Sequence, residues 1–211
     1  DEGNIFDSAD KGTILIDMTT TSPTLAKRIY SQGSQNNLRV LDAPVTGGDT
    51  GAKASTLSIL VGGDKKDYEE CLPIFQAMGT NITYFGAAGS GQHAKMANQI
   101  MIAGTLSGIC EAFTYAKAEG LDLNMFTDAV STGAAGSKQL DFQGRKILDN
   151  NYEPGFFMKH FVKDMKLAQE EAESAGLGLN VLGQVLDNCE KLVENGDGDL
   201  GTQALIKYYM R

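Results

Sequence analysis

Long apolar runs are missing from this sequence of 211 residues. It contains no window of about 18 uninterrupted apolar residues, and it does not open with the basic segment and apolar stretch of a secretory signal. Positive charge is also scarce, because 18 Lys and Arg stand against 27 Asp and Glu, giving a formal net charge of -9. Since nucleic-acid backbones are bound by cationic surfaces, we expect neither nucleic acid nor a membrane as a partner.

Cysteine and metal-ligand clusters are equally sparse. Cys71, Cys110 and Cys189 are far apart and odd in number, which predicts neither a disulfide framework nor a metal site. The acidic stretch "NGDGDLGTQALI" imitates a calcium loop, but Leu200 occupies the position of the invariant glycine and Ile206 that of the bidentate glutamate. We therefore predict three buried thiols, a solvated turn, no metal, and a reducing location, either the cytoplasm or an organelle matrix.

The glycine fingerprint of a dinucleotide-binding domain is absent as well. Such a domain opens with a strand and G-x-G-x-x-G, whereas this sequence begins with the polar "DEGNIFDSADKG". Up to residue 87, strand-like runs nevertheless alternate with helical ones: "TILIDM", "RVLDAPV", "TLSILVG" and "NITYFG" are predicted strands, and "SPTLAKRIYSQ" and residues 65–78 are predicted helices. The pattern predicts the C-terminal half of a Rossmann-type domain, with its first half absent from the sequence shown.

After residue 87 the strand-like runs stop. Apolar residues recur at helical spacing through "GQHAKMANQIMIAGTLSGICEAFTYAKAEG", which predicts a helix of about 28 residues, roughly 40 Å long. Further helices are expected at about 122–131, 137–149, 160–175, 180–194 and 201–210. The predicted fold is thus α/β followed by all-α, with a partial dinucleotide-binding domain over residues 1–87 and a helical domain, including the long interdomain helix, over residues 88–211.

Two stretches carry candidate chemistry. "DAPVTGGDTGA", residues 42–52, places glycines and hydroxyls between two predicted strands, where a short turn would suffice. Lys95, Asn98 and Gln99 share one face at the start of the long helix. This polar stripe either faces water or lines a pocket at a domain junction, and chemistry alone does not decide between the two. The glycines of "FGAAGSGQ" just before it have the reverse of the dinucleotide spacing and predict a flexible joint.

Three motifs follow one another along the sequence: "DAPVTGGDTGAKASTLSILVGG", "GAAGSGQHAKMANQ" and "HFVKDMKLAQEEAE". In content and order they resemble motifs of the β-hydroxyacid dehydrogenases, the family of 3-hydroxyisobutyrate dehydrogenase and tartronate semialdehyde reductase. The resemblance extends from "GTILIDMTTTSP" to "GTQALIKYY". It implies an oxidoreductase that transfers a hydride between NAD or NADP and a small β-hydroxyacid or its semialdehyde or keto form. It also implies that this sequence alone, without the pyrophosphate-binding half, is inactive.

The resemblance assigns the substrate carboxylate to the glycine turn. Thr46, Gly47 and Gly48 would offer a hydroxyl and backbone N–H groups, and such groups form an anion-binding concavity. Thr46 stands where serine is usual in the family, so its extra methyl group is expected to narrow the pocket.

The same resemblance makes Lys95 the catalytic residue. As an ammonium group it would protonate the carbonyl oxygen, and as an amine it would accept the hydroxyl proton in reverse. Burial is expected to lower its pKa from the ordinary value of about 10.4. Many relatives have asparagine where this chain has Gln99, and Asn98 stands beside it. Either of these two carboxamides would therefore hold the substrate or orient Lys95.

The cofactor is assigned to two further segments. Lys163, with Asp164 as its partner, resembles the lysine that reaches the cofactor, and Thr20 matches a position on the nicotinamide side. Thr19 or Thr21 would replace Thr20 if the register shifts by one. The choice between NAD and NADP lies in the absent half and stays open.

Two classes of function follow from these residues. The first is an active dehydrogenase whose helical domain also forms much of a homodimer or homotetramer interface. The alternative is a noncatalytic relative in which the helical domain serves assembly alone. The joint presence of Thr46, Gly47, Gly48, Lys95 and Lys163 favours the enzyme, because assembly requires none of them.

Overall fold

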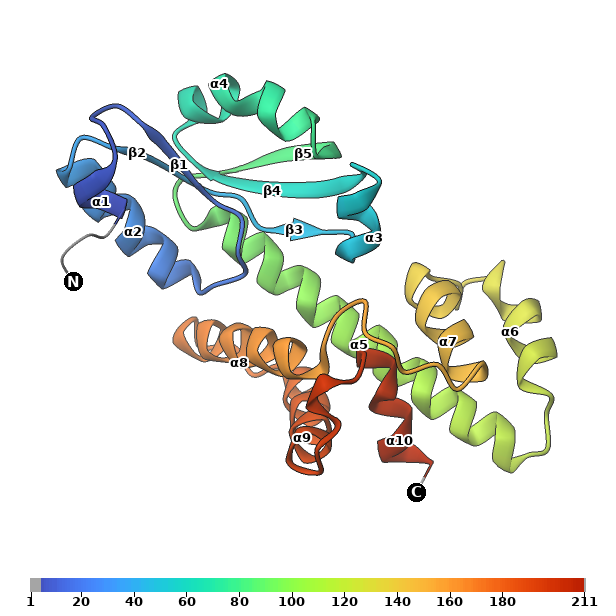
Figure 1. Ribbon diagram of the computed structural model, residues 1–211. Coiled ribbons are helices and arrows are strands. Elements are labelled where there is room, and N and C mark those ends of the chain that lie inside the picture. Colours follow the sequence, from blue (N-terminus) through green and yellow to red (C-terminus); the bar gives the residue numbers. More distant parts are fainter. Residues whose placement is uncertain (1–4, 211) are drawn as a thin grey trace. The chain divides into compact units, whose positions relative to one another are not determined.

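The computed structural model describes residues 5–210 and divides the chain into two compact units, Asp1–Asn98 and Gln99–Arg211. The first unit is an α/β layer structure and the second is helical, which confirms the predicted fold class (Figure 1). The long helix α5, Ser90–Ala118, contributes its first nine residues to the first unit and the rest to the second.

The sheet of the first unit is mixed. Its strands are β1 Ile14–Asp17, β2 Arg39–Asp42, β3 Val45–Thr46, β4 Leu57–Gly63 and β5 Gly79–Gly86. β1 pairs in parallel with β2, and β4 pairs in parallel with β5, but β2 and β3 both run antiparallel to β4. The expected buried strand "TILIDM" is only half-buried as β1, because β2 is its one partner among the described strands.

Two helices cover opposite faces of this sheet, α2 (Pro23–Gln35) and α4 (Lys65–Gln76) (Figure 1). Ser22 caps α2 as predicted, since its hydroxyl accepts the N–H of Leu25 at 3.0 Å, and Pro23 is the first helical residue. Successive strand residues point to opposite faces, so Val40 faces Gly33 of α2 while Leu41 joins the core under α4. That core includes Ile59 and Val61 of β4 and Phe75 of α4.

The glycine-rich stretch at residues 42–52 is more than a turn. Pro44 separates β2 from β3, and both strands pair with the same edge of β4, β3 opposite Ile59 and Ser58. Directly after β3 the chain forms a short helix, α3 Gly48–Lys53, which the sequence did not predict. Gly47 and Gly48 have φ values of 136° and 65°, a backbone conformation that favours glycine, and this conformation turns the chain from the strand into the helix.

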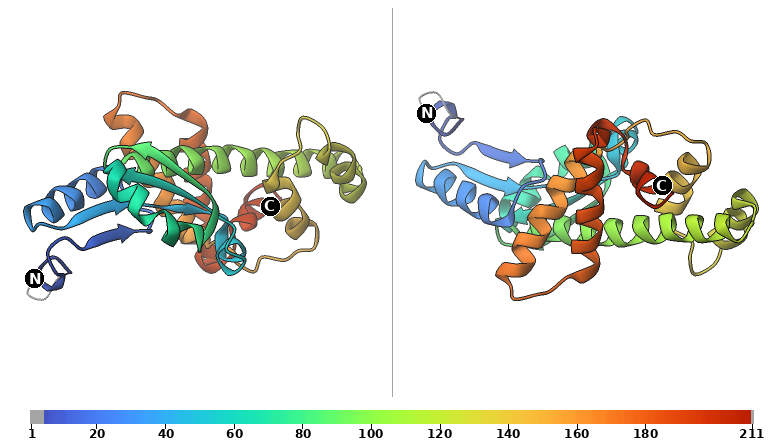
Figure 2. Two further views of the ribbon diagram at one scale, coloured as in Figure 1. Left: turned by 90° about the horizontal axis from the view of Figure 1, so that it is seen from above. Right: turned by 90° about the horizontal axis from the view of Figure 1, so that it is seen from below.

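The second unit packs helices around an apolar core. After α5 come α6 Leu123–Ser131, a π-helical turn Leu140–Gly144 that leads into α7 Arg145–Leu148, α8 Met158–Ser174 and α9 Asn180–Glu194. Two 3₁₀ turns then precede α10 Ile206–Tyr209. The one-turn helix α1, Ile5–Ser8, belongs to the first unit. α8 and α9 lie side by side (Figure 2). The helix expected over 137–149 is confirmed within one residue at each end, since the chain is helical from residue 138 to Leu148 and the Ser137 hydroxyl accepts the N–H of Leu140 at 3.1 Å.

The described residues include the three cysteines and the calcium-like loop singled out in the sequence. The three cysteines are buried and free, as predicted, and burial raises the pKa of Cys189 to about 12. In the calcium-like loop, Asp197 and Asp199 form ion pairs with Lys207 and Lys159. Within residues 5–210, no group of three or more His, Cys, Asp or Glu is arranged to hold a metal ion. No helix over that range has the length and apolar character needed to cross a membrane.

Candidate functional site

A buried carboxylate anchors the start of α5 to the sheet. Asp42, at the end of β2, is 3% exposed and accepts the backbone N–H groups of Gly89 at 2.7 Å and Gln92 at 2.9 Å. The first N–H groups of a helix have no acceptor within the helix, so Asp42 satisfies them and also favours the positive end of the helix dipole. The glycine cluster before α5 is therefore a capped helix start packed on the sheet, and not the flexible joint that the sequence predicted.

Lys95 lies one helical turn beyond this anchor. It is only 7% exposed, on the same face of α5 as the fully buried Gln92. Gln99 on that face is 1% exposed, whereas Asn98 is half-buried. The polar stripe therefore does not face water at Lys95 and Gln99. An ammonium group is rarely buried without a chemical reason, which supports a site over a solvated face.

The glycine turn follows Asp42 along the chain. Thr46, four residues after Asp42, is half-buried on β3, while Gly47 and Gly48 are exposed. A Cβ on Gly47 would stand 3.2 Å from the end of the Leu57 side chain, and the φ value of 136° is strained for any residue other than glycine. The first N–H groups of α3 have no acceptor within the helix, and with the Thr46 hydroxyl they can supply hydrogen-bond donors at this edge.

The Thr19–Thr21 segment follows the carboxyl end of β1 and is held by α5. The side chain of Gln92 donates to the carbonyl oxygen of Thr19 at 2.8 Å and accepts the N–H of Thr21 at 3.1 Å. These two bonds bracket Thr20. The hydroxyl of Thr19 donates to Asp17 at 2.6 Å, which fixes its side chain against the end of β1.

In the second unit, Asp164 of α8 joins two of the predicted residues. Its buried carboxylate accepts the side-chain N–H of Gln99 at 2.7 Å and pairs with the ammonium group of Lys163 at 3.0 Å. Lys163 itself is half-exposed. Because a carboxylate only accepts hydrogen bonds, the amide nitrogen of Gln99 must face Asp164, and its oxygen is turned elsewhere.

Sequence reasoning gave no role to two residues of this arrangement, Asp42 and Gln92. Both are polar and almost fully buried. The available signal was weak: Asp42 directly follows a buried strand, and Gln92 lies in the first turn of a helix that begins in glycines. Their partners stand 47 to 73 positions away along the chain, which no local pattern reveals.

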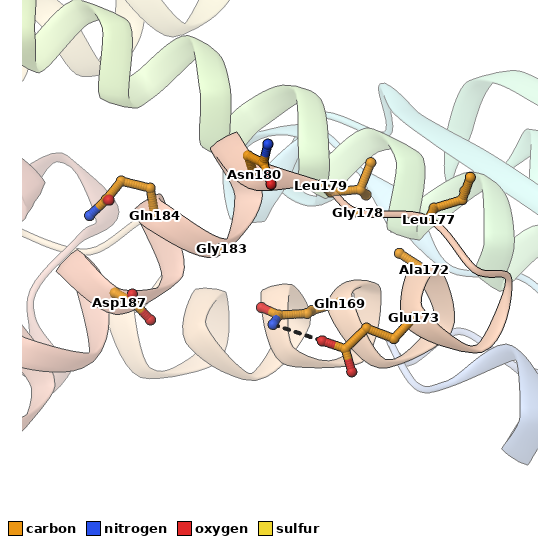
Figure 3. Close-up of a pocket in the computed structure, with 10 residues that line it drawn as sticks. All are labelled: Gln169, Ala172, Glu173, Leu177, Gly178, Leu179, Asn180, Gly183, Gln184 and Asp187. Atoms are coloured by element: carbon orange, nitrogen blue, oxygen red, sulfur yellow. Dashed lines mark hydrogen bonds between the residues drawn. The ribbon is translucent and has the colours of Figure 1, made fainter.

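A surface hollow of the second unit lies between the end of α8 and the start of α9 (Figure 3). It has a volume of about 340 Å³, and Gln169 on its floor donates to Glu173 at 3.0 Å. Its charged lining residues are Glu173 and Asp187, and none of the ten residues that line it is Lys or Arg. A hollow with acidic and carboxamide groups repels carboxylates, so it does not suit an anionic substrate.

Comparison with known protein families matches both units. Residues 89–209 fit a family model described as the NAD-binding domain of NADP-dependent 3-hydroxyisobutyrate dehydrogenase. Residues 1–86 fit a model described as the NAD-binding domain of 6-phosphogluconate dehydrogenase. Together the two matches take in nearly all of the sequence.

Individual proteins agree with these models. An uncharacterized oxidoreductase of Bacillus subtilis, YkwC, is 46% identical over 98% of this chain and 72% of its own length. A probable 3-hydroxyisobutyrate dehydrogenase-like mitochondrial protein of Arabidopsis thaliana is 45% identical over 93% of this chain and 58% of its own length. The structure of 3-hydroxyisobutyrate dehydrogenase from Mycobacterium tuberculosis with L-serine is 28% identical, with a TM-score of 0.88, and the match covers 96% of this chain and 72% of that one. This chain thus spans 58% to 72% of the length of these proteins.

Proposed function

We propose that this chain, which belongs to the 3-hydroxyisobutyrate dehydrogenase-like family of β-hydroxyacid dehydrogenases, serves in the reversible oxidation of a small β-hydroxyacid to its semialdehyde or keto form. The cofactor of this family is NAD or NADP. The observation that carries the proposal is Lys95, a lysine with 7% exposure on the face of α5 that Asp42 anchors to the sheet.

The described residues fit a nicotinamide cofactor. Ligands of open α/β sheets bind outside the carboxyl ends of the strands, and the Thr19–Thr21 segment lies at the carboxyl end of β1, which pairs in parallel with β2. Thr20 would contact the nicotinamide side, and Lys163, paired with Asp164, is the other residue proposed to contact the cofactor. When bound, the nicotinamide supplies or accepts the hydride.

Lys95 acts as the general acid and base in this proposal. During reduction its ammonium group gives a proton to the carbonyl oxygen of the substrate, and during oxidation its amine takes the proton of the substrate hydroxyl. The burial of Lys95 supports this role.

The substrate carboxylate is proposed to bind at Thr46, Gly47 and Gly48. The two glycines are exposed and begin α3, so their backbone can approach an anion without an intervening Cβ. Of the two carboxamides after Lys95, Asn98 is the better candidate for a substrate contact. One side-chain N–H of Gln99 donates to Asp164 at 2.7 Å, which holds this carboxamide toward α8.

Replacing Thr46 by Val tests the carboxylate site. Val keeps the shape and the strand preference of Thr but removes the hydroxyl donor. We expect kcat/KM for the hydroxyacid to fall about tenfold or more, the loss typical of a hydrogen bond to a charged group. Steady-state kinetics of the intact protein measure this effect. Thr80→Val on β5, at an exposed position, is the matched control and should leave kcat/KM unchanged. An unchanged value for Thr46→Val would remove Thr46 from the site.

Assembly is the second proposed property of the helical unit. Met101, Tyr115 and Val181 are 74%, 68% and 65% exposed, and apolar side chains exposed to this degree favour burial against a second copy. We therefore propose a homodimer or homotetramer, with mass determination by light scattering as its test. A purely assembling, noncatalytic protein would have no use for a buried Lys95.

The proposed reaction is tested by a spectrophotometric panel on the intact protein. Small β-hydroxyacids are offered with NAD and with NADP, and semialdehydes with each reduced cofactor, while nicotinamide absorbance is followed. We expect saturable turnover of at least one hydroxyacid with one of the two cofactors. Absence of turnover across the panel, in a protein that binds neither cofactor, would favour the noncatalytic alternative.

A further inference from the structure

We infer that Gln92 is a positioning residue that holds the Thr19–Thr21 segment in register with the start of α5, and thereby aligns the cofactor contact with Lys95. The inference rests on the proposed function and concerns residues of the first unit alone. Gln92 lies three residues before Lys95 on α5 and is 0% exposed.

Its side chain makes a bond on each side of Thr20. The amide nitrogen of Gln92 donates to the carbonyl oxygen of Thr19 at 2.8 Å, and its oxygen accepts the N–H of Thr21 at 3.1 Å. A buried carboxamide that both donates to and accepts from the backbone of one segment fixes that segment in two directions. The glutamine side chain can do this because its planar carboxamide carries N–H donors beside a carbonyl acceptor.

The backbone of Gln92 is fixed in turn. Its N–H donates to Asp42 at 2.9 Å, so one residue links the end of β2, the first turn of α5 and the segment after β1. These three segments carry the proposed carboxylate turn, the proposed acid and base, and the proposed cofactor contact. Since hydride and proton transfer require near-contact geometry, a residue that ties these segments together controls rate without touching the reacting atoms.

The alternative is that Gln92 only fills space in a packed junction. Two substitutions separate these explanations. Gln92→Met keeps the volume and removes both hydrogen bonds. Gln92→Glu keeps the shape of the side chain. When the introduced carboxyl group is ionised, it has no donor and cannot form a hydrogen bond to the Thr19 carbonyl oxygen, which also only accepts. When protonated, the Glu hydroxyl donates to Thr19 again, and the pattern of the native carboxamide is restored.

The expected result is therefore dependent on pH in the Gln92→Glu variant. Burial and the facing carbonyl oxygen raise the pKa of the introduced carboxyl group above its ordinary value of about 4.3. Among nearby charged groups, Asp17 and Asp42 raise this pKa further, whereas Lys95, three residues along the same face of α5, and Lys27, through its contact with His93, lower it. Weakened function at about pH 8 should recover toward the wild type as pH falls toward about 5, since protonation supplies the missing donor.

The measurement is the Kd of NADH and NADPH by fluorescence titration of the intact protein at several pH values, together with kcat. We expect Gln92→Met to raise the cofactor Kd about tenfold and to lower kcat. Gln92→Glu should match that loss at high pH and approach the wild-type Kd at low pH. Gln35→Glu, at the exposed end of α2, adds the same charge and should follow the wild type throughout.

Hydrogen exchange of the Thr21 amide gives a readout without cofactor. The exchange should be faster in Gln92→Met, and in Gln92→Glu it should be faster than in the wild type at high pH only. Wild-type Kd and kcat in both variants at every pH would overturn the role of Gln92 and leave the proposed function standing. A wild-type protein that binds neither cofactor would overturn the proposed function and this inference with it. If Gln92→Met does not fold, the Gln92→Glu titration decides alone.

Discussion

Lys95→Arg should lose about 10² to 10⁴ in kcat although it keeps the positive charge and nearly the length of the side chain. A guanidinium group is effectively never deprotonated in proteins, so it can neither accept the hydroxyl proton during oxidation nor readily release a proton during reduction. Lys95→Ala should lose a similar factor, because the general acid and base is removed in both variants. The position is 7% exposed, so bulk water does not readily replace the group.

Turnover in both directions and direct cofactor titration measure this effect. The cofactor Kd should stay near the wild-type value, since the proposed cofactor contacts are Thr20 and Lys163. Lys117→Arg, at an exposed position in the last turn of α5, is the control and should keep full activity. Near-normal kcat in Lys95→Arg would show that positive charge suffices, and the proton donor would then have to be another group or a bound water.

Gly91→Ala should have the next largest effect, because a single methyl group would separate α5 from the sheet. A Cβ at Gly91 would collide with the carbonyl oxygen of Leu60 and stand 2.7 Å from that of Asp42. Both atoms belong to backbone, so the clash is relieved only if the first turn of α5 moves. We expect a loss of about 2 to 3 kcal/mol in the free energy of unfolding, as for other overpacked interiors.

The same movement would displace Lys95, one turn farther along α5. Displacement of a catalytic group by about 1 Å costs on the order of 10² in rate, so kcat/KM should fall by about that factor. Gly108→Ala on the same helix is the matched control, since its Cβ would meet nothing within 4 Å. It should stabilise the helix by up to about 1 kcal/mol instead of destabilising the protein. Urea unfolding and steady-state kinetics test both, and equal behaviour of the two variants would contradict the close packing of α5 on the sheet.

Much of the fold could be predicted because its signals are local. The start of α2 depends on Ser22 and Pro23, which cap and begin a helix whatever the rest of the chain does. The long helix was predicted at about 28 residues and has 29, since apolar residues recur along it at helical spacing. In contrast, the half-buried edge position of β1 and the antiparallel pairing of β2 with β4 depend on which strands meet.

The residues of the candidate site likewise include some with a local sequence signal and some without one. Lys95, Thr46 and Lys163 could be named as candidates because they lie in sequence motifs with a recognisable order. Asp42 and Gln92 were missed because their function depends on partners far away in the sequence: Asp42 bonds to Gly89 and Gln92, and Gln92 bonds to Thr19 and Thr21. The spacing on α5 also left open whether Lys95 faces water, and only the packed structure, in which Lys95 is 7% exposed, decides this.

The most direct test of the proposed hydride transfer is an isotope measurement on the intact protein. The reduced cofactor is labelled with deuterium at the transferring carbon, a semialdehyde or keto substrate identified by the panel is reduced, and the hydroxyacid is analysed by mass spectrometry. We predict one deuterium on the carbon that carries the new hydroxyl group, and loss of this product in Lys95→Ala. A hydroxyacid without deuterium, or an equal yield from Lys95→Ala, would contradict direct hydride transfer assisted by Lys95.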